Sequence, residues 1–365
     1  MTMRITKALA AVCLCAGVCS AQPSFVSFDP LPGDSHVDVE GVSADGTTVL
    51  MTSTGTIGSF GMRQLAVWRR DTGHFIPEGL NLRNANTHVD GFALSADGSV
   101  ITGWLAGPTS TTAFRWSPSG GYQALAAGSS FLSTSISADG AVVPGWTLSN
   151  SRAAYWSQPT GLVTLPNTLG GSSYSNAASG DGSVIVGGAS FSSGPITAGA
   201  FRWSAATGMT DLGHLPGATS TTAWGVSGDG SVVVGRSGNA VFRWTAQGGI
   251  VQVAEGSVSN YVRITPDGGT ILANVSVPGG IRGMLWDEVQ GRRDLAAILP
   301  LLPGFDASQW SFITPVDISA DGMTIVGDGR DSSGRYKGFM ATIPGPSSVL
   351  GLCCGLVLTR RRRTV

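Results

Sequence analysis

The sequence contains few cysteines, few charged residues and no helical pattern. All five cysteines lie near the ends, at positions 13, 15, 19, 353 and 354, so the central region has no thiol. Charged residues make up only 12% of the chain, and no long stretch has apolar residues at helical spacing. Glycine is abundant, at 53 of 365 residues, and valine, threonine and serine are frequent. This composition is typical of short β-strands joined by tight turns.

Motifs that mark common enzyme classes are also missing. The sequence has no G-x-S-x-G elbow, no H-E-x-x-H, no phosphate-binding Walker loop and no G-x-G-x-x-G. We therefore predict no cofactor, no metal ion and no catalytic residue from motifs. Once the two end segments described below are set aside, 16 basic residues remain against 23 acidic ones, a formal charge of −7. A nucleic-acid partner is not expected, because its usual footprint is a basic patch.

Residues 1–21 have the features of a secretory signal peptide. Arg4 and Lys7 precede an apolar run of 11 residues, from 8 to 18, and small residues follow up to Ala21. Such a run is too short to span a bilayer, which takes roughly 20 apolar residues. We therefore expect export of the chain, with cleavage after Ala21.

The end segment, residues 344–365, reads PGPSSVLGLCCGLVLTRRRRTV. Its apolar run is followed by four arginines from Arg360, which should hold this end on the cytoplasmic side of a membrane. The segment resembles the bacterial PEP-CTERM sorting signal. Pro344 and Pro346 match its two prolines, while Gly345 stands where glutamate is usual. The resemblance implies transient membrane contact, processing by an exosortase-like enzyme, and an extracellular or outer-surface location. The alternative is a short membrane tail that is not processed.

Two short phrases recur along the central region. An Asp-Gly pair occurs seven times in a similar frame, about 46 residues apart on average, at Asp45, Asp97, Asp139, Asp181, Asp229, Asp267 and Asp321. A second phrase, best seen as AFRW, ends six times in tryptophan, at Trp68, Trp116, Trp156, Trp203, Trp244 and Trp286. The seventh copy has Ala341 in that place. Seven similar units predict a repeat architecture over residues 22–343.

Each unit can be divided into four short strands. In the fifth unit we expect them at residues 209–212, 223–227, 231–235 and 240–244. The Asp-Gly pair should join the second and third strands as a two-residue primed turn, with both residues at positive φ. A metal site would need several acids together, and each copy has one. The third strand is apolar at consecutive positions, so it should be buried on both faces.

Seven units of four strands predict an all-β fold, a seven-bladed β-propeller of antiparallel blades whose first and last units combine to close the ring. The phrases also resemble the HAF-type extracellular repeat of bacteria, named for a motif like the AFRW at residues 200–203. The resemblance covers nearly all of residues 25–343. It implies an exported repeat protein and brings no catalytic residues to this chain.

The repeated tryptophans are expected to act as wedges between adjacent sheets. The alternative is a ring of aromatic side chains that stack on sugars. Four other tryptophans fall outside the repeated position and are better candidates for a particular role: Trp104, Trp146, Trp224 and Trp310.

Two groups of acids could take part in acid–base catalysis or calcium binding. Asp34, Asp38 and Glu40 are close together and could act as acid and base, but such clusters are usually solvated loops. Asp328 and Asp331 could hold calcium weakly, but the serine and glycine around them favour a turn.

Two classes of function remain. The first is a binding or structural scaffold for a carbohydrate or protein partner, favoured because closely repeated blades leave few unique polar residues. The second is an exported polysaccharide hydrolase or lyase, which would need acids or histidines from several blades to converge at the mouth of the channel.

The connections between strands predict which face binds a ligand. Alternate connections of an up-and-down blade lie on opposite faces. The Asp-Gly turns and the turns after the tryptophans are uniform, whereas the other connections vary in length, and recognition usually uses such loops. We therefore predict that a ligand contacts the variable face, with Arg83, Asn84, His88, Asp306 and Trp310 as candidate contacts.

Overall fold

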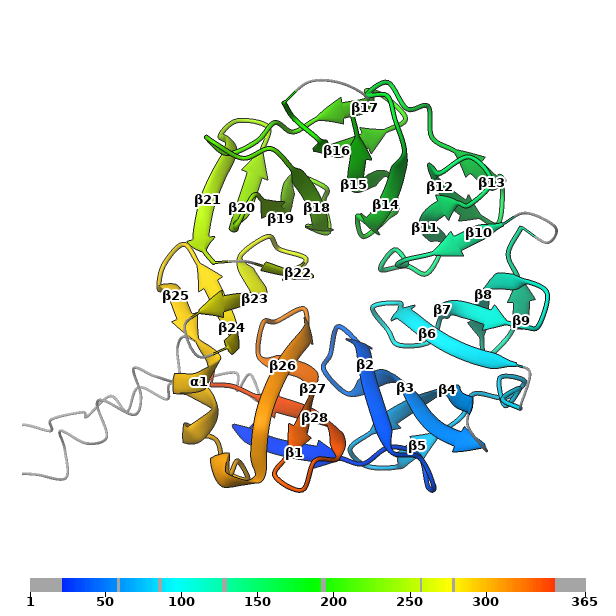
Figure 1. Ribbon diagram of the computed structural model, residues 1–365, viewed down its shortest axis with the longest axis vertical. Helices are drawn as coiled ribbons and strands as arrows, with labels where there is room; N and C mark the ends of the chain where they lie inside the picture. Colours follow the sequence, from blue (N-terminus) through cyan, green and yellow to red (C-terminus); the bar gives the residue numbers. More distant parts are fainter. Residues whose placement is uncertain are drawn as a thin grey trace, which may run out of the picture. The chain divides into compact units, whose positions relative to one another are not determined.

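The computed structural model describes residues 22–344, apart from residues 58–59, 85–86, 127–129, 192–194, 257 and 278–279. Pro23–Ile343 form one compact unit of seven four-stranded antiparallel sheets arranged in a ring (Figure 1). The prediction of an all-β seven-bladed propeller is therefore confirmed. Three residues predicted to take part in processing, Ala21, Pro346 and Arg360, lie outside the described residues, and Pro344 is the last residue described.

Six blades each use four consecutive strands. Blade 1 contains β2 (His36–Val42), β3 (Thr48–Ile57), β4 (Phe60–Arg69) and β5 (Gly73–Phe75). Blade 2 contains β6 (His88–Leu94), β7 (Ile101–Ala106), β8 (Thr111–Ser117) and β9 (Gly121–Ala124). Blade 3 contains β10 (Phe131–Ser133), β11 (Val142–Thr147), β12 (Arg152–Ser157) and β13 (Gly161–Thr164). Blade 4 contains β14 (Ser173–Ala178), β15 (Val184–Ser190), β16 (Ala198–Ser204) and β17 (Gly208–Asp211). Blade 5 contains β18 (Thr221–Val226), β19 (Val232–Ser237), β20 (Ala240–Thr245) and β21 (Gly249–Glu255). Blade 6 contains β22 (Val258–Ile264), β23 (Thr270–Val277), β24 (Gly280–Asp287) and β25 (Gly291–Asp294).

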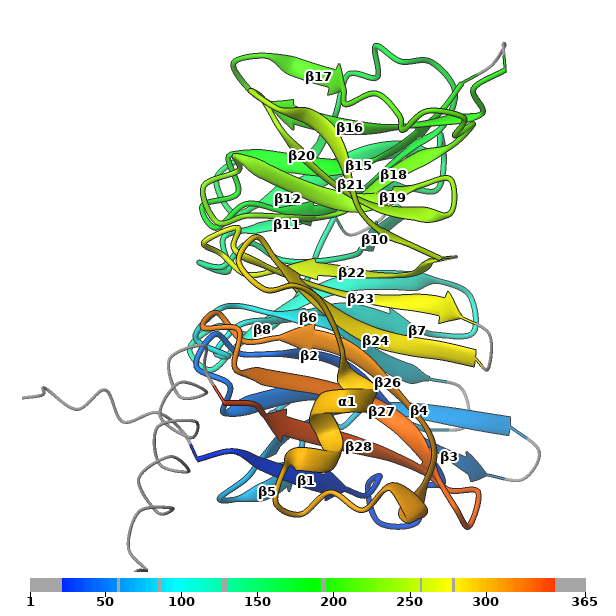
Figure 2. The ribbon, with the colours of Figure 1, turned by 90° about the vertical axis from the view of Figure 1, so that its left-hand side faces the viewer.

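Blade 7 joins the two ends of the propeller. It contains β26 (Trp310–Ile318), β27 (Thr324–Asp331) and β28 (Tyr336–Thr342), and its outermost strand is β1 (Ser24–Phe28). β1 pairs with β28 in antiparallel register, with Val26 opposite Met340 (Figure 1). The connection into this blade carries α1 (Leu295–Ile298), η1 (Leu299–Leu301) and η2 (Ala307–Gln309), which Figure 2 shows along the side of the ring. The prediction that the first and last units combine in the closing blade is confirmed.

The expected division of the repeat into sheets is wrong by one strand. Residues 209–212 were expected to open the fifth blade, but β17 pairs with β16 of blade 4, where Trp203 lies opposite Met209. Only residues 205–207 separate these two strands, so they form a tight hairpin, whereas residues 212–220 lie between β17 and β18. The innermost strand of each blade is therefore the one that precedes the Asp-Gly pair. The strand after the Asp-Gly pair, the second of the observed blade and the third of the expected unit, is buried along almost its whole length in blades 4 and 5, as expected. In blade 2 only its first half is buried.

The Asp-Gly turn also differs from the predicted primed turn. Gly230 has φ of 73°, but Asp229 is not among the described residues with positive φ. The N–H of Gly230 donates to the carbonyl of Ser227, so Gly228 and Asp229 occupy the middle of the turn. The side chains fix this turn, because Ser227 Oγ donates to Asp229 and accepts from the N–H of Val232.

The same network recurs in all seven blades. A serine or threonine two residues before the aspartate donates its hydroxyl to the carboxylate, and that carboxylate also accepts an N–H from two residues further on. An aspartate here needs no unusual backbone angle. Its side chain stabilises an ordinary turn, and only the following glycine must adopt positive φ.

Backbone hydrogen bonds tie these seven turns into a circle. In five blades the residue before the aspartate bonds to the next blade, as in Ala44 N–H to Ala96 carbonyl at 2.7 Å and Gly180 N–H to Gly228 carbonyl at 2.8 Å. In blade 3 the N–H of Asp139 itself bonds to the carbonyl of Gly180 at 3.2 Å. Among the described residues, six of the seven blade junctions have such a bond. The exception is the step from blade 6 to blade 7, where Pro266 has no N–H to donate.

Glycine and phenylalanine pair inside the sheets. Gly235 on β19 lies opposite Phe242 on β20, and a Cβ added to Gly235 would approach the Phe242 ring to 2.8 Å. The ring therefore needs a glycine beneath it. The same pairing occurs in blades 2, 4 and 7. In blade 3, Phe131 from the inner strand covers Gly145 in the same way.

The repeated tryptophans lie at the contacts between neighbouring blades. Trp68 packs with Val326 and Met340 of blade 7, and Trp116 packs with Leu50 of blade 1. The others occupy equivalent clusters between successive blades. In the part of the chain that the structure describes, no helix is long and apolar enough to cross a membrane.

Candidate functional site

The two faces of the ring have different connections. On one face, which we call the Asp-Gly face, three residues separate the third and fourth strands of each of blades 1 to 6. On the opposite, variable face, the connections range from two residues at 238–239 to fifteen at 295–309. Three cavities lie on the variable face, of about 750 Å³ over blade 5, about 370 Å³ between blades 6 and 7, and about 330 Å³ between blades 3 and 4.

Two positions of the repeat vary among the blades. Counted from the aspartate of each Asp-Gly pair, one lies five residues before it and the other seven residues after it. The first position holds Glu40, Phe92, Thr134, Asn176, Trp224, Val262 and Val316. The second position holds Thr52, Trp104, Trp146, Gly188, Arg236, Asn274 and Asp328. The first lies on the innermost strand, towards its Asp-Gly end, except in blade 3, where Thr134 directly follows that strand. The second lies on the next strand outward.

A β-bulge sets the first of these residues apart. In blades 1, 2, 4, 5 and 7 the register of the inner strand shifts there, so that this residue has no partner opposite it. A bulge turns a side chain out of the regular alternation of the strand. Seven inner strands together line a channel cavity of about 190 Å³, to which Glu40, Thr134, Asn176 and Trp224 contribute.

Charged side chains gather at the variable-face end of the channel, on blades 7, 1 and 2. Arg63 joins two inner strands, because it contacts Asp90 at 2.7 Å and Asp38 at 3.1 Å. His36 contacts Asp38 at 2.9 Å and stacks on Tyr336 with ring centroids 3.9 Å apart. We call Asp38, Glu40, Asp90 and Asp328 the acidic cluster.

The environment separates the pKa values within the acidic cluster. Burial raises the pKa of Glu40 to about 8, and the negative charges of Asp38 and Asp90 raise it further. The charge of Arg63 and a hydrogen bond with Thr52 act to lower it but are outweighed. Burial likewise raises the pKa of Asp328 to about 7. Burial also acts to raise the pKa of Asp38. The hydrogen bond from His36 and the charges of His36 and Arg63 together outweigh burial, so the pKa of Asp38 is lowered. A protonated carboxyl and an ionised one therefore lie close together near pH 7.

The solvated-loop interpretation of Asp34, Asp38 and Glu40 is wrong. Asp38 and Glu40 lie on β2, the innermost strand of blade 1, where the sequence HVDVEGV alternates between buried and partly exposed residues. Asp34 is almost fully covered, because it accepts hydrogen bonds from Ser53 at 2.6 Å and Arg83 at 2.7 Å.

Asp331 begins a turn, as expected, whereas Asp328 lies within β27 opposite Thr314, so a turn is wrong for that residue. Its carboxylate accepts N–H bonds from Ser333 and Arg335, and its carbonyl accepts the N–H of Gly334. In the part of the chain that the structure describes, no three His, Cys, Asp or Glu side chains are placed to hold a metal ion together.

Aromatic and polar side chains line the 330 Å³ cavity, which we call the aromatic cleft. Trp146 comes from the second strand of blade 3 and Tyr174 from the inner strand of blade 4, and both are partly exposed. Thr134, Ser151, Ser172, Ser173 and Asn176 complete the lining. Thr134 and Asn176 also line the channel cavity, so the cleft and the channel share a wall.

The residues predicted for ligand contact are spread over two regions, and most have a partner within the protein. Arg83 is paired with Asp34, and His88 Nδ1 lies 3.4 Å from the backbone nitrogen of Arg63. Asn84 bridges to Thr87, and its side chain bonds to Leu82.

The other two predicted contacts belong to the connection into blade 7. Asp306 caps η2 by accepting the N–H of Ser308. Trp310 packs edge-on against Phe25 at 5.8 Å and also lines the 370 Å³ cavity. No hydrogen bond, ion pair or ring contact joins these two residues to Arg83 or His88 among the described interactions.

Sequence reasoning missed the two positions that vary among the blades. Aligning the seven units on their Asp-Gly pairs would have revealed them, because these positions change in a phrase that is otherwise repeated. Trp104, Trp146 and Trp224 were correctly set apart from the repeated tryptophans, and all three occupy these positions.

Comparison with known proteins supports the fold. No protein-family model and no curated protein matches the sequence. The β-propeller domain of the Trilobed protease from Pyrococcus furiosus is similar, with a TM-score of 0.59 at 10% identity over 84% of this chain and 93% of that one. That domain is described as having an open velcro topology, whereas here β1 closes the ring on β28.

Two further structures share the fold. Acylaminoacyl peptidase from Pyrococcus horikoshii has a TM-score of 0.57 at 9% identity, and the match covers 92% of this chain and 56% of the peptidase. Virginiamycin B lyase from Staphylococcus aureus with quinupristin has a TM-score of 0.53 at 14% identity, over 88% of this chain and 100% of the lyase. At such identities the likeness concerns the fold alone.

Proposed function

We propose that this chain is an exported propeller that binds a carbohydrate on its variable face, in the aromatic cleft. The observation that carries the proposal is the lining of the cleft, which combines two partly exposed aromatic side chains with hydroxyl and amide groups. A sugar ring presents apolar C–H groups on its face and hydroxyls at its edge. Aromatic rings suit the face, and hydroxyls and amides exchange hydrogen bonds with the edge.

The backbone holds the cleft in a fixed shape. Tyr174 lies across Gly188, where an added Cβ would come within 2.7 Å of its ring. The N–H of Ser173 bonds to the carbonyl of Ser151 at 2.8 Å, which joins the walls from blades 3 and 4. Asn176 donates its Nδ2 to Ala223 at 2.8 Å, which leaves Oδ1 to accept a bond from a ligand. A site with fixed walls loses little conformational freedom when a ligand binds.

A glycan array followed by calorimetry on the purified protein tests the proposal. The Trp146→Ala variant should bind the selected oligosaccharide at least about fivefold more weakly, because stacking on an aromatic ring contributes on the order of 1 kcal/mol or more. Phe75→Ala is the matched control, since Phe75 is an exposed aromatic residue on the outermost strand of blade 1. An unchanged affinity in Trp146→Ala would show that the cleft is not the binding site.

The location of the protein is part of the same proposal and is supported by the sequence of its ends. Residues 1–21 would direct export and residues 344–365 would direct sorting to the outer surface, as in HAF-repeat proteins with a PEP-CTERM signal. Intact-mass measurement of the exported protein tests both ends. Retention of Met1 contradicts cleavage by a signal peptidase, and retention of Arg360 contradicts processing of the tail.

A polysaccharide hydrolase or lyase is the second candidate, and the acidic cluster favours it. Glu40, with its pKa near 8, would be protonated at neutral pH and could donate a proton to a leaving oxygen, while Asp38 stays ionised. Release of reducing ends from a panel of polysaccharides tests this activity. Glu40→Gln should abolish it and leave binding in the aromatic cleft unchanged, whereas equal activity in this variant would exclude the assigned role.

A further inference from the structure

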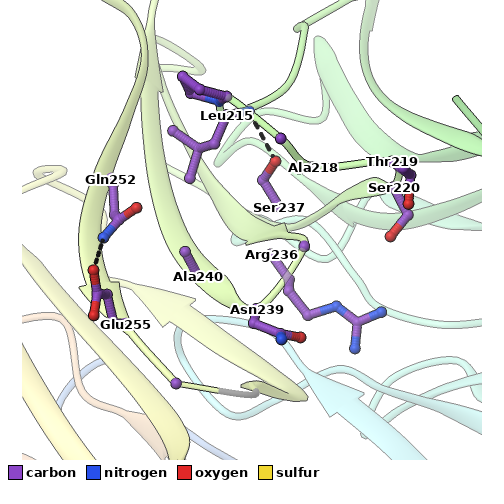
Figure 3. Close-up of a pocket in the computed structure, with 14 residues that line it drawn as sticks. Leu215, Ala218, Thr219, Ser220, Arg236, Ser237, Asn239, Ala240, Gln252 and Glu255 are labelled. Atoms are coloured by element: carbon purple, nitrogen blue, oxygen red, sulfur yellow. Dashed lines mark hydrogen bonds between the residues drawn. The ribbon is translucent and has the colours of Figure 1, made fainter.

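The cavity over blade 5 is the most spacious of those described, at about 750 Å³. Three segments of the variable face enclose it: residues 215–220 before β18, residues 236–240 between β19 and β20, and residues 252–256 at the end of β21 (Figure 3). Hydrogen bonds fix these walls. Leu215 N–H donates to Ser237 Oγ at 3.0 Å, and Gly238 N–H donates to the carbonyl of Ser220 at 2.8 Å.

Arg236 lies in this cavity without a partner. Among the described arginines, only Arg236 and Arg282 have no hydrogen bond, ion pair or aromatic contact. Arg282 is exposed, whereas Arg236 is partly buried between Thr222 and Val241 of the neighbouring strands. Arg236 also occupies the varying position seven residues after Asp229, and no other blade has a basic residue there.

The remaining side chains of the cavity form two groups. Figure 3 shows Arg236 and Asn239 between the Thr219–Ser220 segment on one side and the Gln252–Glu255 pair on the other. Asn239 is exposed and its amide has no hydrogen bond within the protein. Glu255 accepts a hydrogen bond from Gln252 at 3.2 Å, so its charge lies on the opposite wall from Arg236.

We propose that this cavity, here named the arginine pocket, binds an acidic glycan through a carboxylate or sulfate group seated on Arg236. The proposal rests on the proposed function, which supplies the glycan, and adds a second binding site and a charge preference. A guanidinium presents parallel N–H donors that match two oxygens of a carboxylate or sulfate. The hydroxyls of the same sugar would bond to Asn239 and, across the pocket, to Gln252 and Glu255.

The electrostatics favour this arrangement. A partly buried guanidinium has lost some of its hydration and gains no ion pair in return, so a ligand that supplies an anion restores what burial removed. Glu255 disfavours a second anion on the opposite wall but accepts hydrogen bonds from neutral hydroxyls. The pocket therefore distinguishes the charged end of a sugar acid from its hydroxyl end.

Calorimetry with three probes tests the proposal on the full exported protein. The probes are trigalacturonate, its uncharged methyl ester, and a trisaccharide whose only charged group is one sulfate. Wild-type protein should bind trigalacturonate or the sulfated trisaccharide at least about tenfold more tightly than the neutral ester, and raised salt should reduce the difference. The probe that binds more tightly identifies the anionic group.

Two matched variants locate the effect. Arg236→Gln should remove the preference for the charged probes, while Arg282→Gln, which removes the other unpaired arginine, should keep it. Melting temperatures close to that of the wild type would show that both variants are folded. Equal binding of acid and ester by the wild type, or an unchanged preference in Arg236→Gln, would overturn the proposal.

The same experiment separates this proposal from the one before it. Binding of the neutral ester that depends on Trp146 but not on Arg236, with no charge preference, leaves the aromatic cleft in place and rejects the arginine pocket. Absence of binding by all three probes, together with no binder on the glycan array, rejects both.

Discussion

At the Asp-Gly face, a side chain in one blade has the same partner as its counterpart in the next, whereas at the variable face almost every blade differs. Ser227 and Asp229 repeat a hydrogen-bond pattern found in all seven turns. On the same two strands of blade 5, Trp224 and Arg236 stand where blade 1 has Glu40 and Thr52. Each blade thus combines shared positions, which fix its Asp-Gly turn, with individual positions on its two innermost strands.

This difference teaches how a repeat can hold a particular site. The turn network and the backbone circle fix the ends of the inner strands at the Asp-Gly face, so the strands keep their direction whatever residues lie at their other ends. Loops and side chains at the variable face can then change without disturbing the ring. Substitutions at the two faces should therefore have opposite consequences, for stability at one and for binding at the other.

The largest expected effect is a loss of stability when a shared core residue, rather than a varying residue, is truncated. Phe242→Ala removes a fully buried ring from above Gly235 and should lower the free energy of unfolding by about 3–5 kcal/mol. Trp224→Ala removes a partly exposed side chain from the channel wall and should cost clearly less. Urea denaturation followed by circular dichroism measures both variants. A larger loss for Trp224→Ala would contradict the division between the faces.

The shared positions of the repeat were easier to predict from the sequence than the varying ones. The seven Asp-Gly pairs and six tryptophans predicted the number of blades, because they are shared positions. Residues 209–212 were assigned to the wrong sheet because periodicity shows how far apart the units are, not where one sheet ends. The serine or threonine two residues before each aspartate could have revealed the real turn, since a hydroxyl side chain in that place bonds to the turn it precedes.

The varying positions were harder to predict because their meaning depends on tertiary structure. Asp38 and Asp328 are 290 positions apart, and the charge of Asp38 acts on Asp328 only when the ring closes. Arg83 looked like a free contact in a long loop, yet Asp34 from the neighbouring connection pairs with it. A sequence pattern cannot show which charges become paired across blades.

A second prediction concerns one turn of the Asp-Gly face. Ser227→Ala removes a hydroxyl that donates to Asp229 at 2.6 Å and accepts from Val232 N–H at 3.0 Å, and leaves a buried N–H without its partner. We expect a loss of about 1–3 kcal/mol in the free energy of unfolding. Ser231→Ala is the control, because Ser231 is exposed and its hydroxyl bonds to the same carboxylate. Equal losses in the two variants would show that the buried N–H contributes little.

A shared and a varying position should also make stability depend on pH with opposite signs. Hydrogen bonds from Ser227 and Ser231 lower the pKa of Asp229 to about 2 from 3.8, so its contribution to stability is complete above pH 4 and is lost as pH falls towards 2. Glu40 has its pKa raised to about 8 from 4.5, so the folded state holds the proton more tightly and stability falls as pH rises from 4.5 to 8.

Glu40→Gln tests the second of these trends, since glutamine keeps the neutral form at every pH. The variant should melt at least about 2 °C above the wild type at pH 8 and much closer to it at pH 5. Glu78→Gln is the control, because Glu78 is exposed. A difference between Glu40→Gln and the wild type that is the same at both pH values would contradict the raised pKa.

The smallest expected effect is that of calcium. Each aspartate of the seven turns is bonded to the hydroxyl and N–H groups of its own turn, and Asp331 is bonded to Ser333 and Arg335 in the same manner. A calcium ion takes six to eight oxygen ligands. Each turn offers it one carboxylate, and binding would displace the hydroxyl and N–H groups that already bond to that carboxylate. Melting temperatures measured with millimolar calcium and with a chelator should therefore agree within error. A clear rise with calcium would show that the variable face, where Asp328 and Asp331 lie on one strand, rearranges to provide the missing ligands.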